Sequence, residues 1–198
     1  MNIADIHESL MIGQKPDFIP FPNKAWIAGG AIRRWFAGTE ELSDVDVFFP
    51  SQEVFDAYVQ TLTGNGFSKT YVSQNADTYS NGKHLVQCIK VNFFKDVNEL
   101  FDSFDFTLCQ FAWDGNKIYS TTEAIISVLR KHLGVHKIKE EFAVDSLRRA
   151  FKYCSKGYKP CSGTIIDLAN SMIGLTKEKV ATAVEISPAG GKRIIRID

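Results

Sequence analysis

The feature that most constrains the fold is an apolar segment that runs into a glycine pair, followed by two closely spaced aspartates. Residues 25–28, A-W-I-A, predict a short buried strand, and residues 31–36 have helical character. Gly29 and Gly30 lie between them. A strand that ends in glycines at the start of a helix exposes backbone N–H groups, and these form a natural seat for phosphate. The segment therefore predicts a phosphate-binding turn at Gly29 and Gly30.

Asp44 and Asp46 follow at the start of a second predicted strand, residues 45–49. Residues two apart on a strand point to the same face, so the two carboxylates repel unless a cation lies between them. Mg²⁺ or Mn²⁺ suits such oxygen ligands, and two ions there activate an attacking hydroxyl and stabilise a leaving pyrophosphate. Alone, the glycine pair is more often a packing turn and D-x-D a solvated strand end. Their order and context favour a metal and nucleotide site.

The bulk composition narrows the class of protein. Lys plus Arg and Asp plus Glu both number 23, so the formal net charge is zero and contact with nucleic acid requires a local patch. The four cysteines have irregular spacing, which indicates reduced thiols. The N-terminus lacks a signal-peptide pattern, and no apolar run reaches the roughly 18 residues of a membrane span. We expect a cytoplasmic protein with no membrane partner.

The remaining pattern predicts an α+β fold, in which strands and helices are followed by a small helical region. A composition shift near residue 138 places the domain boundary between residues 1–138 and 139–198. The expected elements are helices over 3–12, 51–62, 140–155, 162–173 and 176–186, strands over 67–72, 85–94 and 192–197, a hairpin over 108–119 and a polar loop over 73–83.

Four blocks in order carry a resemblance to a known family. G-G-x-x-R and D-x-D are followed by D-F-T-L-C-Q-F-A-W-D over residues 105–114 and by D-S-L-R-R-A-F-K-Y over residues 145–153. Over residues 24–158 the chain resembles the head and neck of class II CCA-adding enzymes and bacterial poly(A) polymerases, in the DNA polymerase beta-like nucleotidyltransferase superfamily. The resemblance implies a catalytic head with a mixed sheet, followed by a helical neck.

The chain also departs from that family. The family has Arg-Asp after the glycine pair, whereas this chain has Arg33-Arg34. Ser103 and Phe104 replace the two arginines before D-F-T, and Gln87 stands where the superfamily carries a third carboxylate. No E-D-x-x-R element of the kind that selects CTP and ATP is present, so a complete CCA-adding enzyme is not expected.

Further candidate residues come from the segments that carry the resemblance. Arg33 is expected to neutralise phosphate charge. Asp105 either orients its loop or takes part in catalysis. Arg148 and Lys152 lie four apart on a predicted helix, where they either meet a triphosphate or RNA backbone or form a solvated face.

Two functions remain open from the sequence. The first is a nucleotidyltransferase, with Mg²⁺ or Mn²⁺, that moves an NMP from an NTP to an acceptor hydroxyl on an RNA or tRNA 3′ end, a protein or a small molecule. Asp44 and Asp46 would be its metal ligands, and Gly29, Gly30 and Arg33 would hold the phosphates. The second is a catalytically inactive module of the same fold that binds nucleotide, RNA or a protein partner. Gln87 is the residue that motivates it.

Overall fold

The computed structural model describes residues 2–39, 44–173 and 175 and has an α+β fold, which confirms the predicted class. The strands are β1 (Ile3–Ile6), β2 (Trp26–Ala28), β3 (Val45–Phe48), β4 (Ser68–Val72), β5 (Ala76–Ser80), β6 (Leu85–Ile89), β7 (Phe111–Trp113), β8 (Ile118–Thr121), β9 (His132–Leu133) and β10 (Lys159–Pro160). The α-helices are α1 (Gly30–Ala37), α2 (Gln52–Gly64), α3 (Val97–Asp102), α4 (Thr122–Leu129), α5 (Ala143–Ser155) and α6 (Ser162–Ser171). The short 3-10 helices are η1 (Glu8–Leu10), η2 (Thr107–Cys109) and η3 (Glu140–Phe142).

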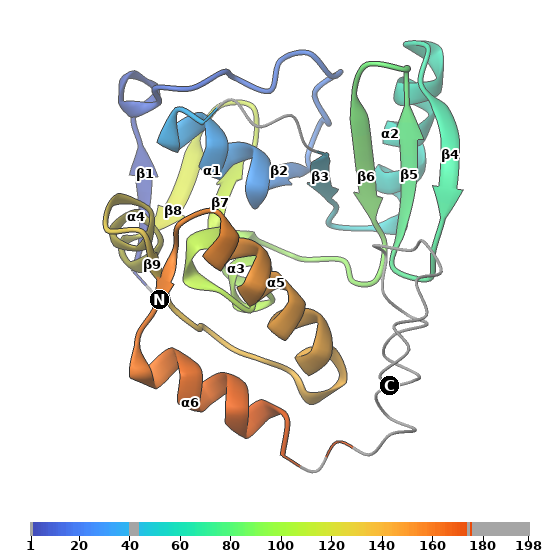
Figure 1. The fold of residues 1–198 in the computed structure, drawn as a ribbon. Helices are drawn as coiled ribbons and strands as arrows, with labels where there is room; N and C mark the ends of the chain where they lie inside the picture. The colour runs from blue at the N-terminus through green and yellow to red at the C-terminus, as the bar shows by residue number, and fades with distance from the viewer. Residues whose placement is uncertain (1, 40–43, 174, 176–198) are drawn as a thin grey trace.

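The main sheet is mixed and has the strand order β1-β8-β7-β2-β3-β6-β5-β4. Strands β3 and β6 run parallel, and the other neighbouring pairs are antiparallel. The two strands of the predicted site are central neighbours, with Ile27 opposite Val47 and Ala28 opposite Asp46. Strand β2, which ends in the glycine turn, and strand β3, which carries Asp46, therefore lie side by side, as Figure 1 shows.

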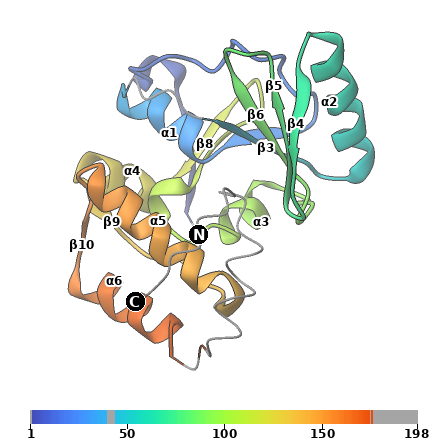
Figure 2. The ribbon, with the colours of Figure 1, turned by 45° about the vertical axis from the view of Figure 1, so that its right-hand side comes forward.

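Helices α1 and α2 cover one face of this sheet (Figures 1 and 2). The core on that face includes Ile27 and Val47 from the sheet, Trp35 from α1 and Phe55 from α2, all in one buried cluster. Because side chains alternate along a strand, Ile27 and Val47 point to this face of the sheet and Ala28 points to the other face.

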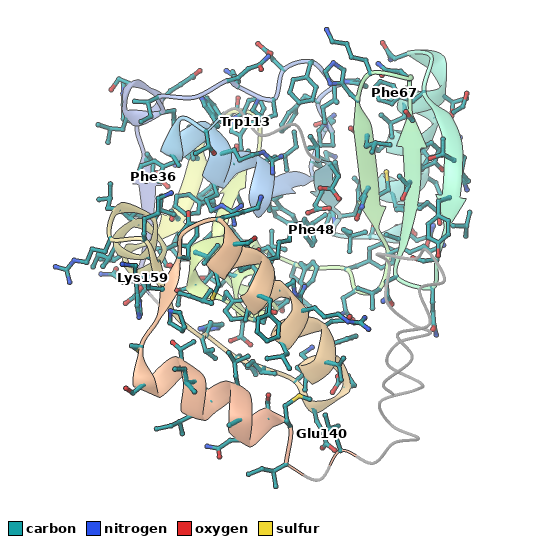
Figure 3. The ribbon with its side chains drawn as sticks, in the orientation of Figure 1. Phe36, Phe48, Phe67, Trp113, Glu140 and Lys159 are labelled. Atoms are coloured by element: carbon teal, nitrogen blue, oxygen red, sulfur yellow. The ribbon has the colours of Figure 1, made fainter. Side chains whose placement is uncertain are left out.

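The other face of the sheet packs against α3. Ala28, Phe48, Leu100 and Phe101 form a second buried cluster there. Phe48 is labelled beside β3 in Figure 3. Because Asp46 alternates with the buried Val45 and Val47, it lies on this second face, where it is half-buried.

Helix α5 packs onto the sheet domain through its buried side. The Tyr153 ring lies 5.7 Å from the Phe106 ring, centroid to centroid, in an edge-on contact. Strand β10, which carries Lys159 (Figure 3), pairs in parallel with β9 and ties the segment after α5 back to the sheet domain. The predicted domain boundary near residue 138 falls between β9 and η3 and stays a prediction.

Helix starts follow local capping chemistry. The Ser51 hydroxyl accepts from the Val54 N–H at the start of α2. The α4 cap is Thr121, whose hydroxyl accepts from the Ala124 N–H.

Two predicted elements are wrong. The segment 3–12 is not a helix, because β1 pairs with β8 as an edge strand and η1 follows it. The segment 73–83 is not a loop throughout, because β5 fills the gap between β4 and β6. Its polar Asp77 is buried and accepts from Lys69 at 2.8 Å and also from Lys90, so a polar sequence forms a central strand. The hydrophobic periodicity of a segment does not by itself predict whether that segment pairs with neighbouring strands. The predicted helix over 176–186 and strand over 192–197 lie outside the described residues.

Within the described ranges, none of the helices combines the length and the apolar character that crossing a bilayer requires.

Candidate active site

The glycine turn brings the backbone close to the acidic pair. Gly29 has φ +72°, in the left-handed region that favours glycine, and its N–H donates to the Phe111 carbonyl at 2.8 Å. A Cβ at this position would lie 4.0 Å from Oδ2 of Asp46. Helix α1 begins at Gly30, so its first N–H groups open beside the carboxylates. The structure thus places the predicted phosphate turn next to the predicted metal ligands.

Asp44 and Asp46 lie at the start of β3, and a neutral amide holds the first of them. Gln87 on β6 is directly opposite Asp46 in the sheet, and its Nε2 donates to Oδ2 of Asp44 at 2.7 Å. The structure therefore places Gln87 beside the acidic pair, where the family resemblance expects a third carboxylate. It contributes an amide there and no third negative charge.

The environment of Asp46 disfavours its ionisation. Burial, followed by repulsion from Asp44, raises its pKa to about 7, and Arg34, Lys152 and Arg149 act in the opposite direction. A carboxylate that resists ionisation beside a second carboxylate is stabilised in its charged form by a cation. The pair thus has the electrostatics of a metal-ligand site.

This shift predicts a pH-dependent stability. Between about pH 4 and about pH 7 the folded protein holds a proton on Asp46 that the unfolded chain releases, so the free energy of unfolding falls as pH rises. In metal-free buffer at about pH 8, we expect Asp46→Asn to stabilise the protein by on the order of 2 kcal/mol, with the gain vanishing near pH 4. Urea unfolding at both pH values measures it.

The control for this experiment is Asp17→Asn, because Asp17 is exposed and remote in sequence from the pair. It should not change the pH dependence. Equal stability of wild type and Asp46→Asn at both pH values would contradict the environment assigned to Asp46.

Three cations surround the acidic pair. Arg34 follows the glycine turn by one helical turn. Its Nη2 donates to the Asp44 carbonyl at 3.0 Å, and its Nη1 lies 3.0 Å from where a Gly30 Cβ would be. Arg149 and Lys152 come from α5 and lower the Asp46 pKa together with Arg34. The site is therefore built from both the sheet domain and the following helix.

Arg33 lies elsewhere. Its side chain is 5% exposed and its guanidinium carbon lies 5.1 Å from the centre of the Tyr153 ring and 5.9 Å from that of Tyr158. The side chain of Arg33, which the sequence analysis expects at the phosphates, thus packs from α1 against Tyr153 of α5 and Tyr158. Helical geometry explains this, since residues 33 and 34 point about 100° apart around α1.

Asp105 and Arg148 are both engaged in ion pairs. Asp105 is buried, and its Oδ2 lies 2.8 Å from Nη2 of Arg149. This contact favours the orienting role over the catalytic one, because Asp105 holds a cation that acts on Asp46. Arg148 is part-exposed and pairs with Asp145 at 3.4 Å.

The sequence analysis named Lys152 but missed Arg34 and Arg149 as site residues. A signal for Arg34 existed, because it is the position at which the chain departs from the family by a change of charge. A signal for Arg149 existed in its spacing of three from Lys152, which places both on one face of a helix.

Of residues 2–39, 44–173 and 175, no group of three or more His, Cys, Asp or Glu side chains is arranged to hold a metal ion. The pair Asp44 and Asp46 remains. Mg²⁺ is commonly bound by one or two carboxylates together with substrate phosphates and water, so these two residues fit it.

Comparison with known proteins decides the family. A family model described as "Gad2: Gabija anti-defense 2 family protein" matches residues 7–131. The chain belongs to the Gabija anti-defense 2 family. A curated family relative, Gabija anti-defense 2 of Bacillus phage SPbetaL7, is 27% identical over 155 residues, which cover 78% of this chain and 38% of that protein. The match to this chain thus spans well under half the length of that relative.

Solved structures show that this member of the Gabija anti-defense 2 family has the fold of the CCA-adding enzyme head. The Thermotoga maritima CCA-adding enzyme with tRNA matches with a TM-score of 0.55 and 15% identity over 81% of this chain and 42% of that one. The Bacillus stearothermophilus CCA-adding enzyme with CTP has a TM-score of 0.54 and 18% identity over 81% and 43%. A tRNA nucleotidyltransferase with a primer tRNA and an ATP analogue has a TM-score of 0.56 and 19% identity over 81% and 51%. The fold expected from the resemblance is confirmed.

Proposed function

We propose that the chain is a metal-dependent nucleotidyltransferase that moves an NMP from an NTP to an acceptor hydroxyl, and that this transfer counteracts the Gabija defense system. The observation that carries the proposal is the position of the Gly29 turn beside Asp46: Ala28 is paired with Asp46, and a Cβ at Gly29 would lie 4.0 Å from its Oδ2. The family description supports the biological setting, and the fold of tRNA-processing relatives supports the reaction class.

Each residue of the site has a distinct role in this proposal. The N–H groups of the first turn of α1, from Gly30 onward, hold the triphosphate, because the Gly29 N–H already donates to the Phe111 carbonyl. Asp44 and Asp46 hold Mg²⁺, which supplies charge neutralisation at the reacting phosphate. Arg34 and Lys152 neutralise phosphate charge.

Two further side chains position this machinery. Gln87 fixes the rotamer of Asp44 through its 2.7 Å hydrogen bond. Asp105 fixes Arg149 through their 2.8 Å ion pair. Arg33 keeps α5 against α1 and takes no part in phosphate binding.

The proposal is tested by incubating the purified protein with each of the four NTPs labelled at the α-phosphate, with Mg²⁺ or Mn²⁺, and with host RNA or protein. We expect label to pass to a macromolecule in a metal-dependent reaction. Metal-dependent NTP binding without any transfer would favour the inactive binding module, for which Gln87 in place of a third carboxylate is the specific observation. Absence of both binding and transfer would contradict both readings.

A further inference from the structure

The order of the strands fixes the side from which an acceptor reaches the site, provided that the proposed transfer takes place. Strand β3 lies between β2, which ends in the glycine turn, and β6, which carries Gln87. In an in-line displacement, the attacking and leaving oxygens lie on opposite sides of the phosphorus. With the triphosphate on the Gly29 and Gly30 side, pyrophosphate leaves toward β2. The acceptor hydroxyl therefore arrives from the side of β6.

A continuous sheet surface extends from the acidic pair in that direction. Asp46 is paired with Gln87, Gln87 with Thr78, and Thr78 with Tyr71, so these side chains form one row across β3, β6, β5 and β4. With strands about 4.8 Å apart, Tyr71 lies roughly 14 Å from Asp46 across the sheet. Helix α2 lies against the opposite face of these strands (Figures 1 and 2).

A second row runs beside the first, with Leu85 opposite Ser80 and Ser80 opposite Ser68. Tyr71 is 44% exposed and Leu85 is 47% exposed, so both apolar side chains are accessible. The two rows define the acceptor face, which consists of Ser68, Tyr71, Thr78, Ser80, Leu85 and Gln87.

The acceptor face has no cationic side chain among its six residues. Lys69 of β4 and Lys90, which directly follows β6, point the other way, since both pair with Asp77 on the α2 side. Proteins that bind single-stranded nucleic acid follow its backbone with a positively charged groove. The six side chains of the acceptor face do not form such a groove.

Its properties suit a polypeptide instead. Exposed tyrosine and leucine side chains among hydroxyl and amide groups are the mixture found in protein interfaces. The face ends at β4, an edge strand whose five residues are all exposed. Such an edge offers unpaired N–H and C=O groups to an extended segment of a partner.

We propose that the acceptor face binds an extended segment of a target protein and that the transferred nucleotide is attached to a serine, threonine or tyrosine hydroxyl of that segment. The hydroxyl oxygen forms a bond to the α-phosphorus of the NTP, the bond from that phosphorus to the β-phosphate oxygen breaks, and pyrophosphate leaves. The hydroxyl proton passes to solvent. The product is a phosphodiester between the side chain and the nucleotide.

The experiment compares two acceptors with the same labelled NTP and Mg²⁺, namely the purified proteins of the Gabija defense system and total host RNA. We expect label on protein. The variant Tyr71→Ser with Leu85→Ser should lower protein labelling about tenfold or more, because exposed interface anchors carry much of the binding energy. It should leave the Kd of a non-hydrolysable NTP within about twofold of wild type, since neither residue lies at the phosphate turn.

The matched control is Ile126→Ser with Leu129→Ser, which removes apolar side chains on α4 that are 42% and 71% exposed. It should label protein at the wild-type rate. Wild-type label on RNA and not on protein would overturn the proposal, and so would unchanged protein labelling by the Tyr71 and Leu85 variant. Transfer to neither acceptor, or no NTP binding, would contradict the proposed function itself and the acceptor assignment with it.

Discussion

Replacing both Asp44 and Asp46 by asparagine is expected to reduce nucleotide transfer by at least about a thousandfold, which corresponds to several kcal/mol of transition-state stabilisation. Asparagine keeps the shape of each side chain but removes the negative charges that attract a divalent cation. The expected loss has two parts, because metal-dependent NTP binding weakens and the remaining complex reacts slowly. Isothermal titration with MgNTP and the label-transfer assay measure these parts separately.

The double variant should remain folded, because the change removes the buried charge of Asp46 and its repulsion from Asp44, the two causes that raise the Asp46 pKa. Its unfolding midpoint at about pH 8 should therefore equal or exceed that of wild type. Asp17→Asn, an exposed acid, serves as the control and should transfer label normally. Transfer by the double variant at more than about a tenth of the wild-type rate would place the metal site elsewhere.

The adjacent residues Arg33 and Arg34 are expected to give opposite phenotypes. Arg33→Ala should lower the free energy of unfolding by about 3 kcal/mol, because it leaves a cavity against the rings of Tyr153 and Tyr158. Arg34→Ala should change stability by less than about 1 kcal/mol but weaken NTP binding about 10- to 100-fold, the loss expected for charge-assisted hydrogen bonds to phosphate. Denaturant unfolding and NTP titration separate the two effects.

Arg33→Met is the control that distinguishes packing from charge. Methionine refills most of the volume and removes a buried charge, so stability should return to within about 1 kcal/mol of wild type. NTP affinity of Arg33→Met should match wild type within about twofold. If Arg33→Met lost NTP affinity as strongly as Arg34→Ala, the sequence-based assignment of Arg33 to the phosphates would be restored.

Strands β1 and β5 were not predicted from the sequence, because their formation depends on pairing with strands that are distant or adjacent in the sheet and not on their own residue pattern. The spacing of Ile3, Ile6 and Leu10 fits a helix, yet β1 forms because the edge of β8 offers hydrogen-bond partners to residues 3–6. Thr78 and Asp77 look like loop residues, yet they lie in β5 because β4 and β6 flank that segment on both sides.

The sequence by itself determined the fold class, the glycine turn and the position of the acidic pair. These follow from short-range rules, since a strand, two glycines and a helix form a local unit and D-x-D on a strand shares one face. The family resemblance pointed to Gln87 at the position of a third carboxylate, but its register opposite Asp46 and its hydrogen bond to Asp44 came from the pairing of β3 with β6.

Only the tertiary structure decided which cations serve the acidic pair. The choice between Arg33 and Arg34 depends on the packing of α1 against Tyr153 of α5, a contact between residues more than a hundred positions apart. The role of Asp105 depends on Arg149 in the same way. The sequence pattern predicts which residues share one face of a helix. Which of these faces lies at the site depends on how the helices pack on the sheet.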